Sequence, residues 1–210
     1  APFLIDADPS FPGFSVPDLA PPLDINTERL SNRRGLLATV DRFQRQVETR
    51  GKAGAFNKFR ERAFSLMTSP EAKKAFDLQS ESEQARQAYG NHTLGQSCLL
   101  ARRLVESGSR YVMINHNNWD THANNFGDLK TNLLPHLDKA LSELLRDLSD
   151  RGMLEKTLVV VSGEFGRTPK INKDAGRDHW GPCFTLTMAG GGIQGGRVVG
   201  TSDEWAAKPA

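Results

Sequence analysis

The sequence has little of what marks several classes of protein. Its only two cysteines, Cys98 and Cys183, lie far apart and form neither a CxxC zinc motif nor a disulfide framework, so two free thiols are expected. The formal net charge is only +2, and no basic stripe is interleaved with aromatic residues, which argues against nucleic-acid binding. No uncharged apolar run approaches the length of a membrane-spanning helix. What remains is a globular composition, with 38% hydrophobic and 25% charged residues.

The beginning of the chain carries no recognisable targeting signal. It opens on Ala1 without a Met, and proline and phenylalanine recur through "APFLIDADPSFPGFSVPDLAPP". We expect residues 1–25 to form an extended segment along the surface of a domain, cut from a longer protein.

Residues 26–91 have the pattern of helices. Leu30 and Leu37 belong to a series of apolar residues at helical spacing, which Gly51 and Gly54 interrupt. We expect this region to be a helical cap or insert next to a larger domain.

Two helix starts are recognisable within this region. In "SPEAKKAF", Ser69 is the expected N-cap and Pro70 the first helical residue. In "SESEQARQAYG", Ser80 is the expected N-cap, Glu83 completes a capping box and Gly90 ends the helix.

From residue 92 onward, helices and apolar strands alternate. The expected order is a helix at 93–108, a strand at 110–115, a helix at 129–152, a strand at 157–162 and a third strand at 184–192. Uniformly apolar strands that alternate with helices are typical of a parallel sheet covered on both faces. The predicted fold class is therefore α/β, with a mostly parallel sheet flanked by helices. The predicted organisation is 1–25 extended, 26–91 helical and 92–210 α/β.

Short polar stretches follow two of the predicted strands. "NNWDTH" comes after the strand at 110–115, and "GEFGRTP" comes after the strand at 157–162. Because the carboxyl ends of parallel strands share one edge of a sheet, both loops are expected there. A third stretch, "GRDHWG", contains the same residue types. The candidate metal ligands in these stretches are Asp120, His122, Glu164, Asp178 and His179.

Carboxylates and neutral imidazoles are the usual oxygen and nitrogen ligands of zinc, manganese and related ions. Three clustered carboxylates would repel one another, and a divalent cation relieves that repulsion. The alternative is a set of hydrogen-bonded polar loops, in which Glu164 pairs with Arg167, Asp178 pairs with Arg177 and His179 stacks on Trp180.

The other histidines are weaker candidates. His116 adjoins the "WDTH" loop and is a candidate outer partner of the site, whereas His92 and His136 are expected to be structural. The glycine-rich "AGGGIQGGRVVG" lacks both GxGxxG before a helix and a P-loop lysine, so no nucleotide cofactor is expected, and a glycine-bearing turn into a β-hairpin is favoured.

Several of these stretches together resemble one bacterial family of unknown function. They are "WDTH", "LPHLDKALSELLRDLSDRGMLEKTLVVVSGEFGRTPKIN", "GRDHW", "AGGGIQGGRVVGTSDEWA", "SPEAKKAFDL", "YGNHTLGQSCLLARRLVESG" and the opening residues. The chain is similar over essentially its whole length to the family numbered fifteen-oh-one among domains of unknown function (DUF). That family resembles a branch of the alkaline phosphatase and sulfatase superfamily, whose members hold one or two divalent metals and hydrolyse or transfer phosphate or sulfate esters.

The resemblance implies a role for each candidate residue. Asp120, His122 and His179 correspond to ligands of one metal, although the superfamily spaces its Asp and His more widely. Glu164 corresponds to a ligand of a second metal, but Phe165 stands where the superfamily has a histidine. The superfamily's nucleophile and first metal-binding Asp precede everything present in this sequence. Arg167 is a candidate contact for a phosphate or sulfate oxygen.

The resemblance thus implies a metal-dependent phosphate- or sulfate-ester hydrolase domain that lacks its nucleophile. The expected cofactor is one or two divalent ions (zinc, manganese, calcium or magnesium), and the expected substrate is a small ester or a sulfated or phosphorylated polysaccharide. The alternative is a non-catalytic binding module with a degenerate phosphatase fold. Because family members often begin with a twin-arginine export signal, a periplasmic or secreted location is expected.

Overall fold

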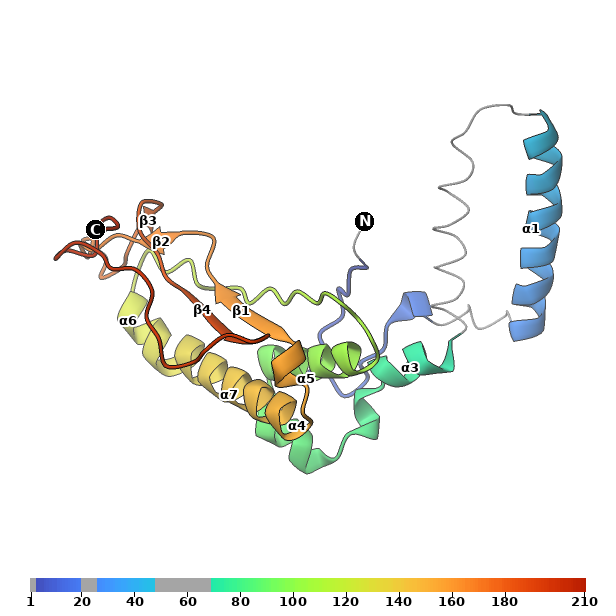
Figure 1. Cartoon of the computed structure of the whole chain (residues 1–210), viewed down its shortest axis with the longest axis horizontal. Coiled ribbons are helices and arrows are strands. Elements are labelled where there is room, and N and C mark those ends of the chain that lie inside the picture. The colour runs from blue at the N-terminus through green and yellow to red at the C-terminus, as the bar shows by residue number, and fades with distance from the viewer. Residues whose placement is uncertain (1–2, 20–25, 48–68) are drawn as a thin grey trace. The chain divides into compact units, whose positions relative to one another are not determined.

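A computed structural model describes residues 3–19, 26–47 and 69–210 of the chain. The chain divides into two compact units, Ala1–Glu81 and Ser82–Ala210 (Figure 1). No helix within the described residues is long and apolar enough to cross a membrane.

The described elements of the first unit are all helical. They are η1 (Pro17–Leu19), α1 (Thr27–Val47), α3 (Pro70–Phe76) and η2 (Leu78–Ser80). The predicted start of α3 is confirmed, because the Ser69 hydroxyl accepts a hydrogen bond from the Ala72 N–H at 3.1 Å and Pro70 lies in the first turn. The predicted interruption at Gly51 and Gly54 lies outside the described residues.

The second unit holds the remaining elements. They are α4 (Glu83–Tyr89), α5 (Thr93–Glu106), α6 (Asn125–Asp128), the π-helical turn η3 (Leu129–Leu133), α7 (Leu134–Asp150), η4 (Leu154–Lys156), β1 (Leu158–Ser162), β2 (Gly166–Arg167), β3 (His179–Trp180) and β4 (Leu186–Gly190). The N-cap predicted at Ser80 is wrong. Ser82 caps α4 instead by accepting from the Ala85 N–H, while Gly90 ends the helix as predicted, with a φ of 98°.

The core of this unit lies between α4, α5 and α7. Leu99 and Ala140 are completely buried, and Leu148 is almost so. Arg102 is also buried, and it forms an ion pair with Asp147 of α7 at 2.9 Å. Because a buried charge that loses a partner is costly, removal of Asp147 is expected to weaken the packing of α5 on α7.

The predicted parallel sheet is wrong. Within the described residues there are two sheets of two strands each, both antiparallel: β1 with β4, and β2 with β3. The chain between β1 and β4 folds into the β2–β3 pair instead of a crossover helix, so β4 returns antiparallel to β1. The alkaline phosphatase-like α/β fold is therefore not supported.

The strand predicted at 110–115 is also absent. Residues 111–116 alternate between exposed and half-buried positions, as a strand does, but residues 110–116 make no backbone hydrogen bond to another described residue. Tyr111 and Met113 are 79% and 66% exposed. The expected parallel pairing with residues 157–162 is thus wrong, because β1 bonds to β4 alone.

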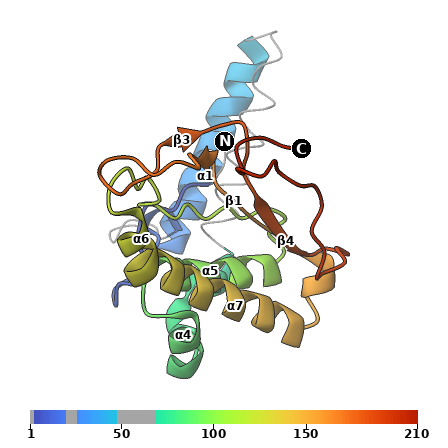
Figure 2. The ribbon, with the colours of Figure 1, turned by 90° about the vertical axis from the view of Figure 1, so that its left-hand side faces the viewer.

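The β1–β4 ribbon lies on one side of α5 and α7 (Figure 2). Its register sets Val160 opposite Met188, and both side chains are about half exposed, as is Leu158. The glycine-rich stretch that follows β4 contains no β-hairpin; residues 191–200 have no regular strand and are exposed. The ribbon leads directly into the turn that starts the β2–β3 arm, where the candidate site lies.

Candidate metal centre

Two segments that are distant in sequence cross at the candidate site. The ligand loop (residues 116–125) follows residues 110–115. The arm (residues 166–180) is a hairpin that contains β2 and β3. Backbone hydrogen bonds join the two: Asn125 N–H donates to the Ala175 carbonyl at 3.0 Å, and Arg177 N–H donates to the Thr121 carbonyl at 3.1 Å. The crossing is therefore fixed by main-chain pairing rather than by side chains alone.

Gly176 makes the crossing possible. A Cβ atom at this position would lie 1.9 Å from the carbonyl oxygen of His122. The loop and the arm can approach this closely only because residue 176 has no side chain.

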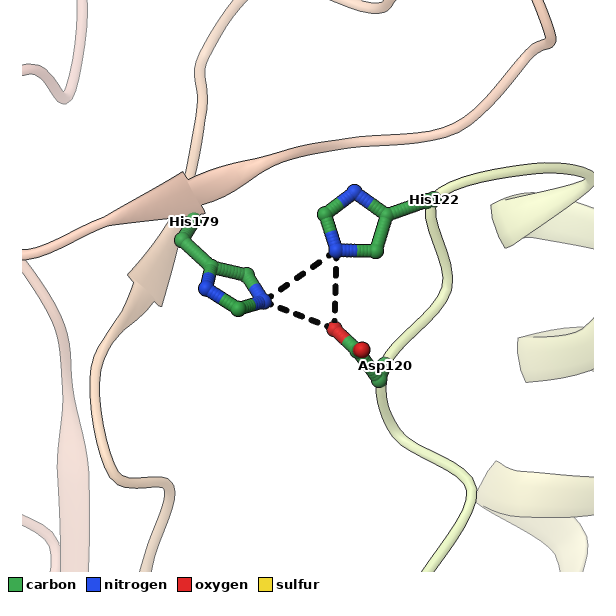
Figure 3. A group of neighbouring side chains, drawn as sticks. All are labelled: Asp120, His122 and His179. Carbon is green, nitrogen blue, oxygen red and sulfur yellow. Dashed lines mark hydrogen bonds and ion pairs between the residues drawn. The ribbon is translucent and has the colours of Figure 1, made fainter.

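Three ligand atoms from the loop and the arm converge (Figure 3). The Asp120 Oδ1 atom lies 3.0 Å from His122 Nε2 and 2.8 Å from His179 Nε2, and the two Nε2 atoms are 3.1 Å apart. All three residues are exposed. His179 reaches Asp120 because its place in β3 is opposite Arg167 in β2, and Arg167 also bonds to Asp120.

Asp178 contacts the other side of the His122 ring. Its Oδ1 lies 2.7 Å from His122 Nδ1, and the same oxygen accepts a hydrogen bond from Asn172 Nδ2 at 3.1 Å. Ionised carboxylates only accept, and Asp120 faces Nε2 at 3.0 Å just as Asp178 faces Nδ1. With an ion at Nε2, the proton of the neutral ring would be on Nδ1 and would be donated to Asp178. That is the arrangement in which a histidine binds a metal through Nε2.

Arg167 is held firmly beside the three ligand atoms. Its guanidinium donates to the Arg177 carbonyl at 3.1 Å, to the Trp119 carbonyl at 3.0 Å and to Asp120 Oδ1 at 2.6 Å. A guanidinium has five N–H groups. These contacts therefore use three donors and leave two for a further acceptor.

The carboxylates of the cluster stay ionised well into acid. The hydrogen bonds from His179 and Arg167 lower the pKa of Asp120 to about 2. The hydrogen bonds from His122 and Asn172 lower the pKa of Asp178. Both groups therefore carry a negative charge at any pH at which the histidines are neutral, which is the state that a cation requires.

Glu164 is not part of this group. It lies exposed in the turn between β1 and β2, and it has no hydrogen bond or ion pair with the described residues. The neighbouring Phe165 faces the site instead, with its ring centroid 4.2 Å from that of His179. Within the part of the chain that the structure describes, only Asp120, His122 and His179 form a group able to hold a metal ion.

The donor set fits a transition-metal ion or zinc better than calcium or magnesium. Two imidazole nitrogens and one carboxylate oxygen match the three-ligand sites of catalytic zinc, whereas calcium and magnesium prefer oxygen alone. Ligand atoms around a tetrahedral zinc ion would be about 3.3 Å apart. The observed spacing of 2.8 to 3.1 Å is only slightly shorter, so a small outward movement would accommodate an ion.

Comparison with known proteins assigns the family but no function. The model of the family described as "Protein of unknown function (DUF1501)" matches residues 3–210. The chain belongs to this family. No curated protein and no solved structure matches it. The family resemblance of this DUF1501 chain is thus confirmed, while no comparison links it to the alkaline phosphatase and sulfatase superfamily.

Sequence reasoning found most of this DUF1501 site but missed part of it. The structure brings Asp120, His122 and His179 together, places Asp178 behind His122 and leaves Glu164 outside. Asn172 was missed. Its signal is the "NKDAG" turn, because the Asn172 Oδ1 accepts from the Asp174 and Gly176 N–H groups, as an Asx turn does.

Proposed function

We propose that this DUF1501 chain carries a divalent-metal centre that acts on phosphate or sulfate esters. The observation that supports the proposal is the convergence of two Nε2 atoms and one carboxylate oxygen within hydrogen-bonding distance of one another. A three-ligand site of this kind leaves a coordination position for water or substrate. When bound, a divalent ion lowers the pKa of a coordinated water and polarises an ester oxygen.

The chain's own residues then have separate tasks. Asp120, His122 and His179 hold the ion, and Asp178 keeps the proton on His122 Nδ1. Arg167, fixed by two carbonyl groups, offers its two remaining N–H groups to an oxyanion. The ester class itself rests on the similarity of "WDTH", "GEFGRTP" and "GRDHW" to motifs of the alkaline phosphatase and sulfatase superfamily, and a periplasmic or secreted location rests on the same similarity.

Among the described residues, no hydroxyl near the cluster is arranged as a nucleophile. Ser162 donates to the neighbouring Gly163 carbonyl, Thr121 is buried against Asn125, and Thr168 donates to the Lys170 carbonyl. A covalent mechanism requires a hydroxyl paired with a base. Transfer through a serine or threonine of the described residues is therefore not supported, and direct attack by water fits the observed site better.

The second candidate function is a binding module without catalysis. Phe165 supports it, because an apolar ring lies against His179 and stands at the sequence position where the resemblance implies a further histidine ligand. Such a module would still bind an ion, but it would not turn over esters.

Two measurements separate these functions. Isothermal titration with zinc should show one ion per chain in the wild type and none in His179→Ala. Aryl phosphate and aryl sulfate hydrolysis by the natural full-length protein should then depend on zinc and on His179. Zinc binding without turnover would favour the binding module, and unchanged zinc binding by His179→Ala would remove the basis of both proposals.

A further inference from the structure

His116 makes an unusual contact at the start of the ligand loop. The indole Nε1–H of Trp119 donates to His116 Nδ1 at 3.0 Å, and the two rings meet edge to face at 5.6 Å. An indole nitrogen only donates, so His116 Nδ1 must carry no proton in this state. The contact therefore exists only while His116 is neutral.

Trp119 connects this contact to the metal centre. Its carbonyl accepts from Arg167 Nη2 at 3.0 Å and from the Thr121 N–H at 3.0 Å. The next residue is the ligand Asp120, and Arg167 bonds to that carboxylate as well. A displacement of Trp119 would thus move one ligand directly and the arginine that positions it.

The groups that face His116 are basic. His136 of α7 is close to it, and His136 stacks on His92, the N-cap of α5, with ring centroids 4.0 Å apart. Lys139 of α7 adds a further positive charge next to His92. Burial and His136 lower the pKa of His116; burial, His136, His116 and Lys139 lower the pKa of His92. His116 is therefore neutral at pH 7 and takes up a proton at a lower pH than an unperturbed histidine does.

We propose that His116 and Trp119 form a proton-sensitive latch on the metal centre. Uptake of a proton at His116 Nδ1 removes the acceptor of the Trp119 indole, the ligand loop loosens, and the metal is held less tightly. The latch regulates the metal centre proposed above and rests on that proposal. The latch makes the metal affinity sensitive to acid through His116, which is not one of the candidate ligands.

Metal binding through histidine depends on pH in any protein, so the test compares variants that keep the same three candidate ligands. In His116→Asn, the amide oxygen can accept from the Trp119 indole but does not titrate. In His116→Phe, no acceptor remains at any pH. Zinc affinity is measured by isothermal titration between pH 7.5 and 5.5.

At pH 7.5, His116→Asn should bind zinc as the wild type does, and His116→Phe should bind roughly 2-fold to 12-fold more weakly, the range that one hydrogen bond contributes. At pH 5.5, the wild type should fall below His116→Asn and approach His116→Phe. A constant ratio of wild-type to His116→Asn affinity across this pH range would overturn the latch.

A second readout needs no metal. The indole N–H resonance of Trp119, assigned with Trp119→Phe, should move on acidification with the same midpoint as the ring protons of His116, and it should not move in His116→Asn. If zinc fails to bind but this resonance titrates with His116, the metal centre is wrong while the proton-sensitive contact stands. A resonance that ignores the protonation of His116 would refute the latch whether or not zinc binds.

Discussion

Asp178 tests how the candidate centre works, because it contacts a ligand but is not placed to bind the ion. Replacing it by asparagine keeps the size of the side chain and removes its charge. We expect Asp178→Asn to bind zinc about 10-fold more weakly than the wild type and Asp178→Ala about 100-fold more weakly, the two ends of the range for the outer partners of metal-binding histidines.

The order of these two effects follows from the contacts. In Asp178→Asn an amide oxygen can still accept from His122 Nδ1, so the ring keeps its orientation, but a neutral acceptor makes Nε2 a weaker ligand. In Asp178→Ala the 2.7 Å contact disappears, and His122 can place its proton on either nitrogen. Asn172 would then lose its partner as well.

A nearby carboxylate provides the control. Asp174 lies in the same turn of the arm and is exposed, and only its backbone groups contact the loop and Asn172. Asp174→Asn removes the same charge without touching His122. Isothermal titration at pH 7.5 should therefore give wild-type affinity for Asp174→Asn. Equal losses in Asp174→Asn and Asp178→Asn would show that general electrostatics, not the orientation of His122, sets the affinity.

Two further substitutions test the framework of the site and of the core. Gly176→Ala should abolish zinc binding, because its Cβ would lie 1.9 Å from the His122 carbonyl oxygen and force the loop and the arm apart. Asp147→Ala should lower the free energy of unfolding by about 1–3 kcal/mol in urea denaturation, because the buried Arg102 loses this partner and keeps Glu106 at 2.7 Å.

Each of these substitutions has its own control. A Cβ at Gly181 meets nothing within 4 Å, so Gly181→Ala should bind zinc normally, and a similar loss there would contradict the steric argument. Asp150 lies at the exposed end of α7. The control Asp150→Ala should therefore change the free energy of unfolding by less than about 0.5 kcal/mol.

The Asp147 prediction also has a pH signature. Burial tends to raise the pKa of Asp147, but hydrogen bonds from Arg151 and Tyr89 and the charge of Arg102 outweigh burial and lower it. A lowered pKa means that the stabilisation is complete above the ordinary carboxyl range and is lost as the pH falls through the folded-state value. The difference in stability between wild type and Asp147→Ala should therefore shrink in acid. A difference independent of pH would show that the ion pair is not its source.

The sequence predicts local structure well where one residue type satisfies a local need. Ser69 and Gly90 are examples. A hydroxyl at a helix start accepts from an unpaired N–H group, and a glycine at a helix end adopts the backbone conformation that ends the helix, both within four residues. Ser80 shows the limit of this approach. Ser80 and Ser82 both precede the same helix, and only the pairing with Ala85 shows which of them is the cap.

The sheet could not be predicted in the same way. Residues 110–115 and 157–162 are both apolar with strand-like residues, but such a pattern does not specify a partner or a direction. In the structure one of them pairs antiparallel with β4 and the other pairs with no described strand. We inferred the parallel arrangement from the alternation of helices and strands along the chain. In the structure, hydrogen bonds between residues 158–162 and 186–190 make the pairing antiparallel.

The candidate site nevertheless contains three of the predicted residues, although a different structural feature from the predicted one brings them together. We had expected the loops to meet because parallel strands would end at one sheet edge. They meet instead because main-chain hydrogen bonds join residues 121–125 to residues 174–177, at a point where Gly176 allows contact. The same pairing explains why Glu164 lies outside the cluster, since Glu164 belongs to neither of the paired segments. It explains Asp178 as well: His179 directs Nε2 toward the ligand atoms, and the residue before it bonds to the far side of the His122 ring. The chemistry of the motifs thus identified the cluster, and the crossing of the two segments decides which residues converge and which one contacts His122 from the far side.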